Sequence, residues 1–109
     1  MKIVVAAALV LLPCLSFAEC DRPDAPSLPD GAVSDLATMV EGQKAVKTYV
    51  ADTEAYLACL SAEDEAAAGE LTEEEMAERV AEHNSAVDDM EAIAAAFNEE
   101  IREYKARAQ

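Results

Sequence analysis

Two runs of residues at alternating spacings of three and four constrain the fold of this chain more strongly than any other feature. The first run occupies Leu36, Met39, Gln43, Val46, Val50, Thr53, Leu57 and Leu60. The second run occupies Met76, Val80, His83, Val87, Met90, Ala94, Phe97, Ile101 and Tyr104. Heptad spacing of this kind places side chains in one stripe, or seam, along an α-helix. We therefore expect an all-α fold with helices over about residues 34–62 and 72–107.

Capping chemistry indicates where these helices begin and end. Ser34 and Thr38 are candidate N-caps for the first helix, and residues 72–75 (Thr-Glu-Glu-Glu) form a capping box for the second. Three consecutive acids at 63–65 oppose the helix dipole at the end of the first helix, so we expect fraying there. Residues 66–71 are then the expected connection between the helices.

The two seams match each other when the chain folds back near residue 68. Leu60 then faces Met76, and Val46 faces Met90. This register predicts an antiparallel, coiled-coil-like hairpin within residues 34–109. The same apolar faces could instead pair two chains into a four-helix bundle, and the sequence leaves both arrangements open.

Residues 19–33 form a separate segment ahead of the helices. Its prolines recur at three-residue spacing, at Pro23, Pro26 and Pro29. Proline fixes φ and lacks an N–H, so we expect an extended arm rather than a helix. An arm of this kind reaches about 40 Å, and the first helix climbs about 38 Å between residues 34 and 59. The arm could therefore return along the hairpin, against an aromatic strip formed by Tyr49 and Tyr56.

Residues 1–18 have the three parts of a cleavable secretory signal peptide. Met1-Lys2 gives a positive start, Ile3 to Leu12 is apolar, and Ser16-Phe17-Ala18 places small residues before a cut after Ala18. The apolar run is about ten residues long, whereas a membrane-spanning helix needs about twenty. We therefore expect the mature chain in the periplasm or secreted, without stable membrane insertion after cleavage.

Cys20 and Cys59 are the cysteines that remain after this cleavage. An even number of cysteines in a small exported chain predicts a disulfide. A bond that closes the loop between them would add roughly 3–4 kcal/mol in the chain-entropy model. A bond between two chains is the alternative.

The mature chain is strongly acidic. Cleavage removes Lys2 and no acid, so the formal net charge falls by one, from −15 to −16. This charge argues against nucleic acid and against anionic membrane surfaces as partners. It could attract a basic protein or divalent cations. A weak cation site is conceivable where acids gather near the expected tip, at Glu63, Asp64, Glu65 and Glu70.

Three polar residues interrupt the apolar seam. Thr53 and His83 face each other in the expected register, and Gln43 faces Ala94. His83 could be a pH switch or a metal ligand, but zinc needs several His or Cys ligands and none stands at a suitable spacing. We favour a polar seam layer of Thr53, His83 and Gln43 that fixes the register.

No pattern of catalytic residues is evident. The chain has three glycines, no phosphate-cradling loop and no nucleophile elbow, and its only histidine lies on the seam. We therefore expect no enzyme activity, no catalytic residue, no resident metal and no cofactor.

Several short motifs stand in one order along the mature chain. They are Cys20-x-x-Pro23, Pro29-Asp30-Gly31, residues 43–50 (Gln-Lys-Ala-Val-Lys-Thr-Tyr-Val), residues 56–60 (Tyr-Leu-Ala-Cys-Leu), His83-Asn84 and Phe97-Asn98. In these motifs the chain resembles a group of small, uncharacterised exported proteins of Gram-negative bacteria. The resemblance implies a periplasmic location and no known activity. We expect a structural or protein-interaction module whose partner is another protein or a second copy, with an acidic divalent-cation-binding module as the alternative.

Overall fold

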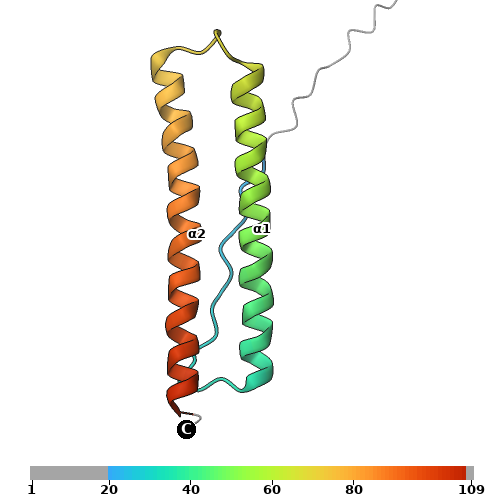
Figure 1. Cartoon of the computed structure of the whole chain (residues 1–109), viewed down its shortest axis with the longest axis vertical. Coiled ribbons are helices and arrows are strands. Elements are labelled where there is room, and N and C mark those ends of the chain that lie inside the picture. Colours follow the sequence, from blue (N-terminus) through green and yellow to red (C-terminus); the bar gives the residue numbers. More distant parts are fainter. Residues whose placement is uncertain (1–19, 108–109) are drawn as a thin grey trace, which may run out of the picture.

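The computed structural model describes residues 20–107, which form two long helices and no strand (Figure 1). Helix α1 spans Leu36–Ala66 and helix α2 spans Glu73–Arg107, and they pack side by side in opposite directions. The predicted all-α helical hairpin is confirmed. The predicted signal peptide and its cut after Ala18 lie outside the described residues. Within residues 20–107, neither helix contains a stretch long and apolar enough to cross a membrane.

Helix α1 begins at a different cap from the two candidates. The N-cap is Asp35, whose carboxylate accepts a hydrogen bond from the Thr38 N–H at 2.8 Å. Hydrogen bonding from Thr38 also holds the pKa of the Asp35 carboxyl below its ordinary value. Ser34 and Thr38 are therefore wrong as caps. Asp35 is the cap because its backbone is extended, as an N-cap requires, and because its carboxylate reaches the N–H of Thr38, three residues later.

Helix α1 also ends later than the acidic residues 63–65 suggested. It continues to Ala66 because Arg79 of α2 lies against the end of α1 and partly neutralises these acids. The Arg79 guanidinium is 2.7 Å from an Asp64 carboxylate oxygen and 3.9 Å from one of Glu63. The connection turns through Gly69, whose φ of 86° lies in the region that favours glycine. Thr72 caps α2 as predicted and accepts a hydrogen bond from the Glu75 N–H at 3.1 Å.

The buried stripe of α1 differs from the predicted seam. It consists of Met39, Gly42, Val46, Tyr49, Thr53 and Tyr56. Gly42 therefore takes the place expected for Gln43, which is exposed, and the two tyrosines are more deeply buried than Val50 and Leu57. Leu36, expected on the seam, is 61% exposed.

The predicted seam of α2 is buried along part of the helix but exposed at one end of the hairpin. Phe97 and Ala86 are buried, and Phe97 packs in the core with Met39 and Val46. Near the tip, by contrast, Met76 and Val80 are 47% and 60% exposed. The apolar core therefore lies around Met39, Val46 and Phe97, and the tip is poorly covered.

Segment 20–34 explains the shifted stripe on α1. It contains no helix or strand, and it runs alongside both helices from the upper half of α1 to the base of α2 (Figure 1). At the base it turns at Asp30, whose carbonyl accepts hydrogen bonds from the N–H groups of Val33 and Ser34. The segment covers the side of α1 that carries Gly42, Tyr49 and Tyr56, so these residues are buried.

Candidate functional site

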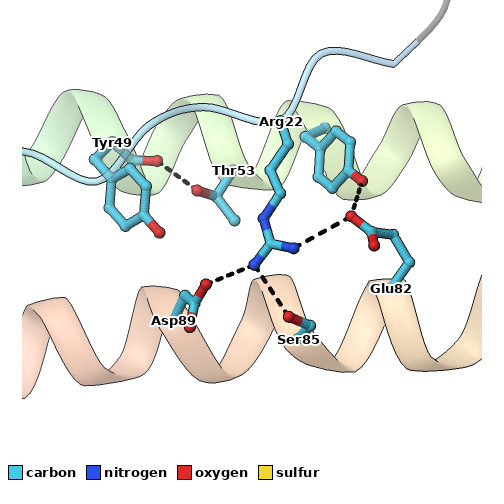
Figure 2. A network of polar contacts seen from close by, with 7 residues as sticks. Arg22, Tyr49, Thr53, Glu82, Ser85 and Asp89 are labelled. Atoms are coloured by element: carbon cyan, nitrogen blue, oxygen red, sulfur yellow. Dashed lines mark hydrogen bonds and ion pairs between the residues drawn. The ribbon is translucent and has the colours of Figure 1, made fainter.

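Arg22 joins segment 20–34 to helix α2. Its guanidinium is 3.2 Å from a Glu82 carboxylate oxygen, 3.2 Å from the Ser85 hydroxyl and 2.6 Å from an Asp89 carboxylate oxygen. The side chain reaches between the two helices, and its three partners lie along one side of α2 (Figure 2). Because the planar guanidinium presents several donors at once, one residue fixes the segment to two turns of helix.

Tyr56 connects α1 to the same network. Its hydroxyl donates to the Glu82 carboxylate at 2.6 Å, and its side chain is only 6% exposed. Burial and the hydrogen bond to the Glu82 carboxylate raise the pKa of Tyr56 to about 12. The hydrogen bond from Tyr56, together with that from Arg22, lowers the pKa of Glu82. Glu82 therefore stays ionised and holds α1, α2 and the segment together.

The other end of the segment packs closely against both helices. A Cβ atom on Gly42 would come within 2.6 Å of the Pro29 ring, and one on Gly31 would come within 1.8 Å of the Glu100 carbonyl oxygen. The Gly31 N–H also donates to a Glu100 carboxylate oxygen at 2.7 Å. Glycine is therefore needed at both positions, because the Glu100 backbone occupies the place of a side chain at Gly31 and the Pro29 ring occupies it at Gly42.

Cys20 and Cys59 are placed at disulfide-bonding distance within one chain. Their Cα atoms are 5.7 Å apart, which is a normal separation for a disulfide. Cys20 begins the described segment and Cys59 lies in the upper half of α1. The pair therefore lies at one end of the segment, and the Pro29–Gly42 contact lies towards the other.

The predicted polar seam layer does not form as one group. Thr53 is buried, with 1% exposed, but its hydroxyl donates to the Tyr49 carbonyl of its own helix at 2.8 Å (Figure 2). His83 is half-buried, and Gln43 is exposed. Gln43 is therefore wrong as a seam residue, because the helix turns Gly42 rather than Gln43 towards the segment and Phe97.

The predicted cation site at the tip is not assembled either. Of its four acids, Glu63 and Asp64 face Arg79, and Glu65 and Glu70 are exposed. Three carboxylates do come close together elsewhere in the described chain, at Asp30, Glu100 and Glu103. Repulsion from Glu100 raises the pKa of Glu103 in this group. These acids lie at the base of the hairpin, where the sequence alone had indicated no site.

Two hollows lie between the helices, one near each end of the hairpin, and we call the side of the hairpin that joins them the open groove. Its lower end is a hollow lined by Leu36, Met39, Val40, Gln43, Phe97, Ile101, Tyr104 and Lys105. Near the tip, an apolar hollow includes Leu71, Met76 and Val80. Val80, Val87, Ala94 and Ile101 recur at sevens along α2, so the two hollows lie on nearly the same side of that helix.

No protein-family model, no curated protein and no solved structure matches the chain. The fold and its surfaces are therefore the observations that bear on function.

The Arg22 network was missed in the sequence. A signal for it exists, because Glu82, Ser85 and Asp89 are spaced by three and four and so share one face of α2. Arg22 is also the only basic residue among the prolines of the segment. Neither feature identifies the other as its partner unless the position of segment 20–34 relative to α2 is known.

Proposed function

We propose that the mature chain is exported to the periplasm and serves there as a structural or protein-interaction module. The apolar leader and the cysteine pair support export, because disulfides persist in oxidising compartments. Segment 20–34 acts in this proposal as an arm that closes one groove of the hairpin permanently and so stiffens it. The module then presents its open groove to a partner.

One observation carries this proposal: large apolar side chains remain exposed at both ends of the open groove. They are Leu36 and Val40 at the base, and Met76 and Val80 at the tip. Exposed apolar side chains that gather at each end of one groove indicate a surface that contacts other molecules. Their exposure means that they contribute little to the core of the hairpin itself.

Photo-crosslinking in cells tests this proposal. The full precursor is expressed in a Gram-negative bacterium with a benzophenone amino acid in place of Val80 or, as the control, of Ala81. Ala81 is also exposed but is turned by about 100° around α2. We expect a discrete crosslinked product from the Val80 position alone. No product from Val80, or equal products from both positions, would contradict a binding function for the open groove.

The alternative is divalent-cation binding. It has weaker support at the tip because Arg79 already lies against two of the four acids there. A ligand that binds only the folded state must raise the melting temperature. Melting the mature protein in millimolar calcium, against a matched concentration of sodium chloride, distinguishes the two: an unchanged melting temperature removes the alternative.

A further inference from the structure

The length of the open groove determines which occupant could cover its exposed apolar side chains. Helix α1 has 31 residues, so the groove is about 45 Å long at 1.5 Å per residue. Its exposed apolar side chains are concentrated towards its two ends, with Leu36 and Val40 at the base and Met76 and Val80 at the tip. A short peptide could cover one end, whereas a helix or a helical hairpin of similar length covers both.

Two opposite charges flank the middle of the groove on α1. Lys47 lies seven residues from Val40 and Glu54 seven residues from Lys47, so the three share one side of the helix. Neither Lys47 nor Glu54 makes an ion pair within residues 20–107. Both are exposed. A partner that offers an acid to Lys47 and a base to Glu54 is therefore favoured here.

A second copy in the antiparallel direction offers both of these charges. A two-fold axis near Val50 lies midway between Lys47 and Glu54, so each Lys47 meets the Glu54 of the other copy. The Tyr56–Glu82 contact shows which residues of α1 and α2 lie at the same height along the hairpin. Because the helices are antiparallel, Met76, six residues before Glu82, lies at about the height of residue 62, six residues after Tyr56. The same axis then brings Val40 of one copy to about the level of Met76 of the other.

The ends of the molecule are also complementary in this direction. Lys105 lies at the lower end of the open groove and makes no ion pair within the described residues. Reversing a second copy places the acidic tip, residues 63–75, beside it. A parallel copy would instead oppose Lys47 to Lys47 and tip to tip, which repels.

Part of the acidity lies away from this surface. Glu82, Asp89 and Glu100 face segment 20–34 on the other side of the hairpin, where they contact Arg22 and Gly31. Charges on that side are separated from a second copy by the width of a helix, about 10 Å, which is about one Debye length at physiological salt. Repulsion across the dimer is therefore weakened but not abolished.

We propose that a second copy of this chain docks antiparallel in the open groove, which gives a two-fold symmetric four-helix bundle. This inference rests on the proposed function and names the partner. With helices about 10 Å apart, each copy contributes about 450 Å² of groove, and the pair buries on the order of 1,000 Å². Specific interfaces begin near that size, so the groove offers enough area for a weak, reversible dimer.

Sedimentation velocity of the unreduced mature chain, from about 1 to about 500 μM, tests this inference over the range of weak to moderate affinities. Val80→Glu places a charge in the interface, and Ala81→Glu is the matched control on the outer side of α2. We expect reversible dimerisation of the wild type, at least about 10-fold weaker dimerisation for Val80→Glu, and no change for Ala81→Glu. Circular dichroism confirms that each variant keeps its helices.

A charge exchange tests the antiparallel direction. Lys47→Glu opposes two acids and should weaken the dimer, whereas Lys47→Glu with Glu54→Lys in the same chain should restore it. A wild type that stays monomeric throughout, or a dimer insensitive to both Val80→Glu and the charge exchange, would overturn the inference. If the wild type is monomeric while the Val80 probe still captures another protein in cells, self-pairing fails and the proposed interaction function stands.

Discussion

Arg22 contacts three side chains of α2 from a segment that has no secondary structure of its own. Its partners are partly exposed, so each ion pair contributes little alone, but the guanidinium engages them together. This residue is therefore the main polar attachment of the upper part of segment 20–34.

Replacing Arg22 with alanine should lower the free energy of unfolding by about 1 kcal/mol, because it removes both ion pairs and the bond to Ser85. Urea unfolding followed by circular dichroism measures the change. Arg102→Ala is the matched control, since within residues 20–107 Arg102 forms an ion pair with Glu99 alone, on its own exposed helix face. Equal effects of the two substitutions would show that the network does not hold the segment.

Tyr56 should make the fold sensitive to high pH. Its pKa is raised from an ordinary 10.0 to about 12, so the folded state holds the proton more tightly than the unfolded state does. The resulting stability is fully present below pH 10 and is lost as the pH rises towards 12. Denaturation of wild type and Tyr56→Phe across this range should show a smaller alkaline loss in the variant. Parallel curves would mean that Tyr56 ionises freely in the fold.

At the scale of helices, Gly42 is the position where α1 accommodates the segment. Alanine normally favours a helix over glycine by about 1 kcal/mol. Here the added methyl group would meet the Pro29 ring at 2.6 Å, so either the segment or the ring must move.

Gly42→Ala should therefore destabilise the protein in the wild-type background, by about 1–3 kcal/mol as overpacking does. In a Pro29→Ala background the same substitution should become much less destabilising, because the ring is gone and the remaining close contact is with Phe97 Cε2 at 3.2 Å. Urea unfolding of the four proteins of this double-mutant cycle measures the coupling. A stabilising effect in both backgrounds would show that the segment does not lie against Gly42.

Much of the helical architecture could be predicted from the sequence. Alternating spacings of three and four are strong signals, and Thr72 was correct as a cap because the capping box is local. The deeper burial of Tyr49 and Tyr56 could not be predicted from periodicity alone, because it depends on where a distant segment lies. Gly42 has no side chain and so gave no hydrophobic signal. The C-terminal end of α1 was expected to fray because its acids were considered without Arg79 of α2, which pairs with two of them.

The functional surfaces were harder to predict than the helices. The acids at the tip are nearly consecutive in the sequence and so are easy to find. The three carboxylates that do come together are far apart in the sequence, with Asp30 in a turn and Glu100 and Glu103 on α2. The spacing of Met76 and Val80 is that of core seam residues. Only their exposure in the structure shows that they belong to the surface. Both errors arise because spacing reports which side of a helix a residue occupies and not what covers that side.

At the scale of the whole molecule, the Cys20–Cys59 pair joins the start of the described segment to the upper half of α1. In the oxidised protein it closes a loop with a sequence separation of 39 residues. Cys20→Ser with Cys59→Ser should lower the free energy of unfolding by about 4 kcal/mol in the chain-entropy model, and reduction of the wild type should have the same effect. Urea unfolding with and without reductant measures this, and equal stability would show that the pair is not oxidised.

Native mass spectrometry of the mature protein, purified without reductant from a periplasmic extract, tests the central claim most directly. The claim is that each chain closes its own Cys20–Cys59 bond and that two such chains pair through their open grooves without a covalent link. The predicted spectrum shows chains that begin at Glu19, each with the mass of one oxidised cysteine pair, and a dimer that dissociates on mild activation. A dimer that separates only after reduction, or chains that remain monomeric at every concentration, would contradict it.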